Sequence, residues 1–317
     1  MKRKLSLILL LALITIIATA CGSATETASG SEKSTDKQEI TVKHQLGETK
    51  VSKNPKNVVV FDYGILDSLD KLGVEVAALP QETLPGYLEK YKSDKYQNAG
   101  GIKEPDFEKI NEIGPELIII SGRQMDAYEE LSEIAPTIFM GVDTTRYMES
   151  FEENTKTLGE IFGKEKEVEK ELAKVEETVN SVKEKTSNLD KNSLIILANE
   201  GNISAYGPGS RFGLIHDVLG VKAVDENLEV STHGQTISFE YLVEKNPDYL
   251  FVVDRGAAVQ GGKSSAESVV ENALVKDTKA VKEGNVVYLD PDYWYLAGGG
   301  LVSVSEMVKE VEAGLAK

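Results

Sequence analysis

Three arginines are the residues whose type and spacing best suit chemistry in this sequence. Beyond residue 20 the cationic residues are mostly lysines, and only four are arginines. Three of these, Arg123, Arg211 and Arg255, stand in glycine-marked loops just past predicted strands. A guanidinium keeps its charge and presents a rigid fork of donors to delocalised anionic oxygens. The pattern favours one shared site for an anionic ligand over the alternative, in which each arginine pairs with a nearby carboxylate.

Aromatic residues flank the same loops. Tyr206 precedes Arg211, and Trp294 and Tyr295 lie just ahead of a run of three glycines. A flat ring near several arginines suits an aromatic ligand, so we expect these three aromatic residues to line the site. Packing between lobes is the alternative for the cluster at residues 293–295. We expect the glycine run to be a turn before a helix, because no Lys-Ser/Thr pair follows it as in a phosphate loop.

The three histidines do not form a metal-binding pattern. His44, His216 and His233 are scattered and have no cysteine partners, so the sequence predicts no direct zinc or manganese site. His216 lies in an apolar helix pattern and is expected to be structural, whereas His233 is a candidate lining residue. No nucleophile, Walker or zinc-protease motif is present. The sequence therefore indicates a binding protein rather than an enzyme.

Two glutamates occupy equivalent places in an internal repeat. Residues 107–123 and 239–255 match without a gap at Phe, Glu, Pro and Arg. Each copy predicts a short helix, a turn, a buried strand and an arginine at the carboxyl end of that strand, where open α/β sheets place ligands. Glu108 and Glu240 fall in the first helical turn, where a carboxylate stabilises the helix N-terminus. They also put one exposed acidic residue on each lobe, where a membrane partner would meet both.

The elements that must position these residues form an α/β pattern. Short β-branched runs alternate with amphipathic segments over residues 39–162 and again over 189–317, which predicts two α/β lobes with mainly parallel sheets. Residues 163–188 carry one narrow apolar stripe between charged positions and predict a single long connecting helix. The expected fold class is therefore α/β, with two lobes bridged by one helix.

The first residues predict export. Residues 1–20 combine a basic start with an apolar run that is shorter than the roughly 20 residues a membrane span needs, as in a signal peptide. The only cysteine, Cys21, follows Ala18-Thr19-Ala20, which excludes an internal disulfide and predicts lipidation over a free terminal thiol. Residues 21–38 are then the lipidated cysteine and a flexible tether.

Net charge excludes one class of partner. Removing the three positive charges of residues 1–20 changes the net charge from −17 to −20. A protein this acidic is a poor partner for nucleic acid. Binding an anion requires that its few arginines be gathered in one place.

Together these motifs resemble the class III substrate-binding proteins of ABC importers for siderophores, haem and cobalamin. The likeness covers nearly the whole chain and is most specific at residues 42–47, 206–217, 231–235 and 294–300. These segments are similar to those of Bacillus-type petrobactin-binding lipoproteins. Ala18 departs from the usual leucine of a lipoprotein box.

The resemblance implies residue roles and partners. In that subfamily an arginine triad holds the anionic ferric catecholate, and Arg123, Arg211 and Arg255 match it. Glu108 and Glu240 match glutamates that dock into arginines of the permease. A hexadentate siderophore fills the coordination sphere of iron itself, so no cofactor and no protein metal ligand are implied. The implied partners are a permease with its ATPase, and the implied state is a monomer held by lipid on the extracytoplasmic face of the cell membrane.

The leading hypothesis is a binding protein for ferric catecholate or mixed catecholate-citrate siderophores. Ferric catecholates carry net negative charge, which three arginines favour over near-neutral hydroxamates. A haem or corrinoid ligand is the second hypothesis and would need an axial ligand such as His233 or Tyr295. An anchored extracellular hydrolase is a third, although no carboxylate pair is singled out. A structural interaction module would not explain the arginine-bearing loops.

Overall fold

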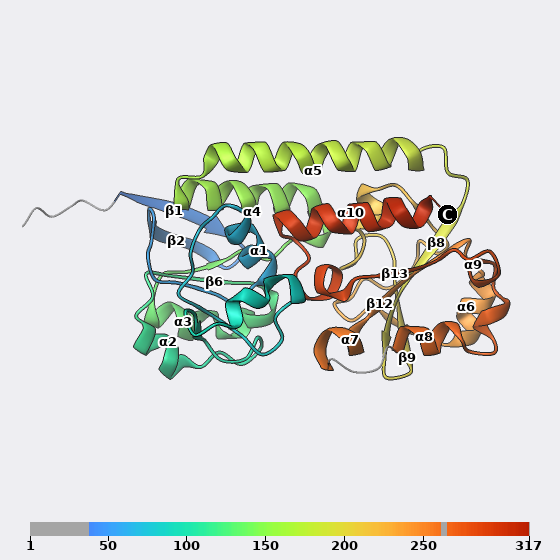
Figure 1. Ribbon diagram of the computed structural model, residues 1–317, viewed down its shortest axis with the longest axis horizontal. Helices are drawn as coiled ribbons and strands as arrows, with labels where there is room; N and C mark the ends of the chain where they lie inside the picture. Colours follow the sequence, from blue (N-terminus) through green and yellow to red (C-terminus); the bar gives the residue numbers. More distant parts are fainter. Residues whose placement is uncertain (1–37, 261–264, 317) are drawn as a thin grey trace, which may run out of the picture. The chain divides into compact units, whose positions relative to one another are not determined.

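The computed structural model describes residues 38–260 and 265–316. The predicted signal peptide, Cys21 and all but the last residue of the predicted tether lie outside the described residues. Within them, no helix is both long and apolar enough to cross a membrane. Figure 1 shows the arrangement of the described elements.

The first lobe is built on a five-stranded sheet in which every pairing is parallel. Its spatial order is β5-β4-β3-β6-β7. The strands are β3 (Val58–Val60), β4 (Ala78–Leu79), β5 (Gln97–Asn98), β6 (Leu117–Ile120) and β7 (Thr137–Phe139). A separate hairpin of β1 (Glu39–His44) and β2 (Gly47–Ser52) lies against β7, where Thr49 Oγ1 donates to the carbonyl of Thr137 at 2.8 Å. The parallel sheet expected for this lobe is confirmed.

The second lobe has a mixed sheet. Its order is β11-β9-β8-β12-β13, with β10 paired to β8. The strands are β8 (Asn192–Asn199), β9 (Asn202–Tyr206), β10 (Lys222–Ala223), β11 (Gln235–Ile237), β12 (Tyr249–Asp254) and β13 (Val286–Leu289). Strands β8, β10, β12 and β13 pair in parallel, but β9 runs antiparallel to both β8 and β11. The reversal follows from the tight turn at Glu200 and Gly201, whose φ values of 51° and 84° fit a two-residue hairpin.

The helices follow the predicted pattern. They are α1 (Tyr63–Lys71), α2 (Phe107–Ile113), α3 (Tyr128–Ile134), α4 (Tyr147–Phe162), α5 (Glu165–Thr186), α6 (Phe239–Lys245), α7 (Arg255–Gln260), α8 (Ser265–Val270), α9 (Lys279–Lys282) and α10 (Leu301–Leu315). The predicted long helix is α5, which begins after Gly163 and buries its narrow stripe of Val168, Leu172, Val175, Val179 and Val182. Figure 1 shows α5 alongside α4 and α10, and it contacts both.

The repeat predicted from the sequence is a repeat of structure. Helix α2 leads to β6, and α6 leads to β12. The side chain of Asp106 accepts a hydrogen bond from the Lys109 amide, and that of Ser238 accepts one from the Tyr241 amide, so each helix is capped alike. Each helix ends in a left-handed residue, Gly114 in one copy and its counterpart asparagine in the other.

A second tie between the lobes was not expected. Helix α10 packs against α1 of the first lobe as well as against α5. The carboxylate of Asp67 on α1 accepts hydrogen bonds from the amides of Val302 and Ser303, both at 2.8 Å. Ser68 Oγ accepts another from the Leu301 amide at 3.0 Å. The N-terminus of α10 is therefore capped by a helix far away in the sequence.

The glycine run at residues 298–300 permits this close approach. A Cβ on Gly300 would lie 2.4 Å from the Gly64 carbonyl oxygen and 2.5 Å from the Asp67 carboxylate. Gly299 has φ +113°, which side-chain-bearing residues rarely adopt. The expectation of a turn before a helix is confirmed, and its glycines are needed because two helices nearly touch there.

Candidate anion-binding site

The three arginines singled out in the sequence meet at one residue, Tyr295. Arg123 Nη2 donates to the Tyr295 carbonyl oxygen at 2.8 Å, and Arg211 Nη2 donates to the same oxygen. Arg255 Nε donates to the Tyr295 hydroxyl at 3.0 Å. Side chains from three separate segments and from both lobes therefore converge on one residue.

Two of these arginines lie at the carboxyl ends of parallel strands, where open α/β sheets place ligands, and one does not. Arg123 lies just past β6 and Arg255 directly follows β12, as open α/β sheets predict. Arg211 lies beyond β9, which runs opposite to its neighbour β8. It therefore reaches the site through the loop that follows β9.

The loop that carries Arg211 is held in a defined conformation. Gly209 has φ +71°, and its amide donates to Asp217 Oδ2 at 2.6 Å. Thr144 of the first lobe donates from Oγ1 to the Gly209 carbonyl oxygen at 3.0 Å. The position of Arg211 is thus fixed from its own lobe and from the other lobe.

Among the described residues, the three arginines have no carboxylate partner within ion-pair distance. In residues 38–260 and 265–316, ion pairs within 4.0 Å are made by lysines and by Arg146, but not by Arg123, Arg211 or Arg255. Burial lowers the pKa of Arg211, and the nearby charge of Arg123 lowers it further. In the described chain, therefore, carboxylates do not neutralise the three arginines, which was the alternative left open by the sequence. An anion is the partner that would relieve their repulsion.

Each guanidinium keeps donors for a ligand. A guanidinium has five N–H donors, and the bonds to described residues use two on Arg123, one on Arg211 and two on Arg255. At least three donors therefore remain on each. The acceptors that orient them are carbonyl, amide and hydroxyl oxygens.

Tyr295 lies between these charges. Its ring centroid is 4.3 Å from the guanidinium carbon of Arg211 and 6.0 Å from that of Arg255, so both make cation–π contacts. Burial raises the pKa of Tyr295, but the hydrogen bond from Arg255 and the charges of the three arginines outweigh it and lower that pKa. The surroundings therefore stabilise negative charge on an aromatic oxygen.

Two other predicted aromatic residues are buried beside this site. Trp294 is 2% exposed, its Nε1 donates to Glu310 at 2.7 Å, and its ring packs edge-on against Phe212. Core packing and this bond occupy the indole, so Trp294 lies in the core beside the arginines, and its contact with a ligand stays a prediction. Tyr206 is 1% exposed and packs on Phe212 at 4.6 Å, and burial raises its pKa to about 12.

His216 and His233 differ in burial. His216 is buried, its Nδ1 lies 2.8 Å from the Val221 carbonyl oxygen, and burial lowers its pKa, so it is structural. His233 is exposed in a turn packed on Tyr206, since a Cβ on Gly234 would lie 2.7 Å from that ring. His233 remains a candidate at the margin of the site. Nowhere in the described chain do three or more potential metal-binding side chains gather.

Three neighbours of the arginines were not predicted from the sequence. Asn199 Oδ1 accepts from Arg255 Nη1 at 2.9 Å, and Thr144 holds the Arg211 loop. Tyr147 is buried in the electrostatic field of Arg211, and its hydroxyl has no hydrogen-bond partner among the described residues. The position of Asn199 at the carboxyl end of β8 was the one available signal.

The predicted docking glutamates lie apart from this site. Glu108 and Glu240 are both exposed in the first turns of α2 and α6. Hydrogen bonds from its own backbone amide and from Ser238 lower the pKa of Glu240. Both carboxylates are available to a partner.

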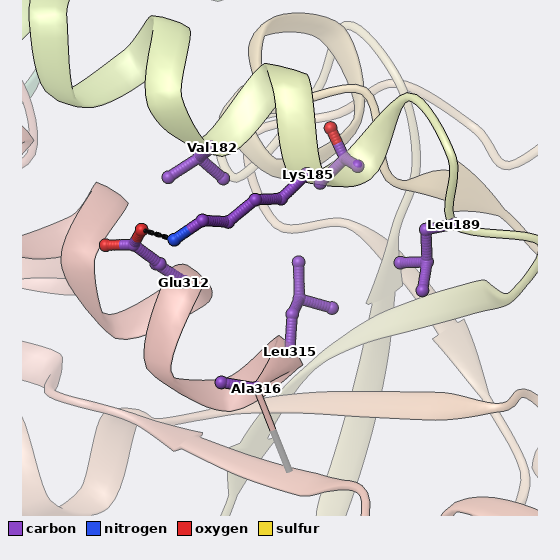
Figure 2. A pocket seen from close by; sticks show the side chains of 7 residues that line it. Val182, Lys185, Leu189, Glu312, Leu315 and Ala316 are labelled. Carbon is purple, nitrogen blue, oxygen red and sulfur yellow. Dashed lines mark hydrogen bonds and ion pairs between the residues drawn. The ribbon is translucent and has the colours of Figure 1, made fainter.

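A small cavity lies elsewhere. It has a volume of about 100 Å³ and lies between the C-terminal ends of α5 and α10 (Figure 2). Val182, Leu189 and Leu315 line it, and Lys185 pairs with Glu312 across it. None of the three arginines lines this cavity, and its walls offer no set of donors for an anion.

Known proteins are similar to this chain in sequence and in fold. The family model described as periplasmic binding protein matches residues 58–293. The petrobactin-binding protein YclQ of Bacillus subtilis is 55% identical over 315 residues, which cover 98% of each chain. Its crystal structure matches with a TM-score of 0.86 at 57% identity, covering 89% of this chain and 100% of that one.

Two more distant structures share the fold. The periplasmic catecholate-siderophore-binding protein VctP of Vibrio cholerae matches with a TM-score of 0.83 at 37% identity, over 87% of this chain and all of that one. The siderophore-binding protein BauB, solved with two acinetobactin molecules and ferric iron, matches at 0.81 and 35% identity, over 87% and 98% of the two chains.

Proposed function

This chain belongs to the periplasmic binding protein family, and from that premise we propose that it captures a ferric catecholate siderophore of the petrobactin type for an ABC importer. The observation that carries the proposal is the convergence on Tyr295 of three arginines that have no carboxylate partner in the described chain. The similarity to a petrobactin-binding protein and to a catecholate-siderophore-binding protein supports the same ligand class.

The charge of the ligand follows from the arginines. Charge-assisted hydrogen bonds contribute about 1.5 to 3 kcal/mol each. Three arginines would supply roughly 5 to 9 kcal/mol before desolvation, a large share of the roughly 12 kcal/mol behind nanomolar binding. A ligand with anionic catecholate oxygens would bind more tightly by this free energy, whereas a near-neutral ferric hydroxamate would not.

Iron is the cargo in this proposal. The siderophore fills the coordination sphere of the metal, so the protein binds the chelator and supplies no cofactor. The chain acts as a binding protein and catalyses no reaction. It works as a monomer, anchored through lipidated Cys21 on the extracytoplasmic face of the cell membrane, and delivers the ligand to a permease and its ATPase.

A titration tests the ligand class. We expect a ferric catecholate to quench the emission of Trp294, the only tryptophan, saturably and at submicromolar concentration. A ferric hydroxamate should cause no saturable quenching in the same range. The measurement is fluorescence of the purified protein, with the iron-free buffer as the blank. Binding of haem or cobalamin with no response to the catecholate would overturn the ligand but keep the family.

Glu108 and Glu240 are proposed to dock with the permease, one from each lobe. Reversing both charges in Glu108→Lys/Glu240→Lys should leave siderophore affinity unchanged, because both residues are exposed and make none of the bonds that hold the arginines. Uptake of radiolabelled ferric siderophore by cells should fall more than tenfold, since two charge pairs with the permease become repulsive. The matched control is Glu112→Lys/Glu244→Lys on the same two helices, which should transport normally. Equal loss in both variants would contradict the assignment.

A further inference from the structure

Arg255 is oriented by a hydroxyl oxygen and an amide oxygen. Its Nε donates to the Tyr295 hydroxyl at 3.0 Å and its Nη1 donates to Asn199 Oδ1 at 2.9 Å. The bond to Asn199 has the usual length of an N–H···O hydrogen bond. The two acceptors therefore hold the guanidinium from two directions and leave three of its five donors for a ligand.

Asn199 holds this position because of the sheet. It is the last residue of β8, and β8 pairs in parallel with β12 so that Ala198 lies opposite Asp254. One residue further along each chain segment, Asn199 ends β8 and Arg255 begins α7. The register alone therefore brings this amide to the start of α7, on a strand that is hydrogen-bonded on both sides.

The amide of Asn199 is uncharged, and its lack of charge affects the site more than its shape does. Aspartate has the same size as asparagine and would accept a stronger, charge-assisted bond from Arg255. It would also stabilise the ligand-free protein, because the nearby guanidinium groups have no carboxylate partner among the described residues. With asparagine here, the ligand-free protein is less stable, but the positive charge of Arg255 stays available to an anionic ligand. Binding sites commonly lower the stability of a protein in this way.

We propose that Asn199 is a positioning residue that aims Arg255 without neutralising it, and so sets the negative charge that the site requires of its ligand. This inference rests on the proposed function and extends it from the arginines to the residue that orients one of them. It predicts that the charge at position 199 controls affinity for anionic ligands, beyond any effect on folding.

The test compares Asn199→Asp and Asn199→Ala with Asn202→Asp as the matched control. Asn202 pairs with Asn199 across the same hairpin and is exposed, so it receives the same charge change outside the arginine cluster. For a ferric catecholate we expect Asn199→Asp to weaken binding about 30-fold to 100-fold and Asn199→Ala about threefold to tenfold. Asn202→Asp should stay within about twofold of wild type, since exposed charges interact weakly.

Two further readouts separate positioning from a structural role. The dependence of affinity on salt, between about 0.03 and 0.3 M, should be flatter in Asn199→Asp than in wild type, because one charge no longer attracts the ligand. Without ligand, the melting temperature of Asn199→Asp should rise by about 2 to 4 °C, while that of Asn199→Ala should fall or stay unchanged. A merely structural asparagine would give lower melting temperatures in both variants.

Equal affinities of wild type and Asn199→Asp, or a lower melting temperature for Asn199→Asp than for Asn199→Ala, would overturn the inference. If wild type binds no ferric catecholate, the proposed function fails. The ligand-free melting temperatures still decide whether Asn199 holds an uncompensated arginine. The two failures are therefore distinguishable.

Discussion

Replacing Arg211 by alanine is expected to weaken binding of the ferric catecholate by about a hundredfold or more. Arg211 shares the Tyr295 carbonyl oxygen with Arg123 and stacks on the Tyr295 ring, so it links the other two arginines. Removing one partner of a desolvated charge pair typically costs 2 to 5 kcal/mol, mostly as faster dissociation. Stopped-flow and equilibrium quenching of Trp294 would measure both effects.

Two variants make this test specific. Arg211→Lys keeps the positive charge but loses the planar fork, so its affinity should fall between those of wild type and Arg211→Ala. Arg146→Ala removes an exposed arginine that already pairs with Glu149 and Glu153, and should leave affinity unchanged. An Arg211→Ala protein that binds like wild type, or an Arg146→Ala protein that binds as weakly, would refute the assigned site.

The second large effect is expected for stability. Asp67→Ala should lower the free energy of unfolding by about 2 to 4 kcal/mol, because two amides at the N-terminus of α10 and the Tyr87 hydroxyl lose their acceptor. Asp67 is 1% exposed, so water does not replace it. Urea unfolding at neutral pH would measure the change. The control is Asp70→Ala on the same helix, which removes a partly exposed ion pair with Lys90 and one hydrogen bond from Tyr91 and should cost less than Asp67→Ala.

Asp67 also predicts a pH dependence with a definite sign. Burial raises the pKa of Asp67 to about 6, although hydrogen bonds from Val302, Ser303 and Tyr87 oppose the increase. Because the folded pKa lies above the unfolded value of 3.8, the contribution to stability is complete below about pH 4 and is lost as pH rises through 6. The difference in unfolding free energy between wild type and Asp67→Asn should therefore fall by about 2 to 3 kcal/mol between pH 4 and pH 7.5. A difference that stays constant or grows over this range would contradict the raised pKa of Asp67 in the folded protein.

Local pattern was enough to determine much of this protein. The narrow stripe of valines and leucine predicted α5, because a helix repeats every 3.6 residues whatever it packs against. The matched segments at 107–123 and 239–255 predicted two equivalent helix–strand units, and with them the placement of Arg123 and Arg255 at the ends of buried strands. These features depend on residues a few positions apart, so the sequence alone carries them.

Tertiary structure decided which residues share the site. Arg211 follows β9, which runs antiparallel to β8. The rule that ligands bind at the carboxyl ends of parallel strands therefore does not predict its hydrogen bond to Tyr295. The sequence predicted a ligand contact for Trp294, but the structure places its indole in the core, where it donates a hydrogen bond to Glu310. Asn199 was not predicted from the sequence, because only the register of β8 and β12 brings it beside Arg255. Arg123 and Tyr295 are separated by 172 residues. A hydrogen bond across that distance depends on how sheets and helices pack, and periodicity within one segment carries no information about it.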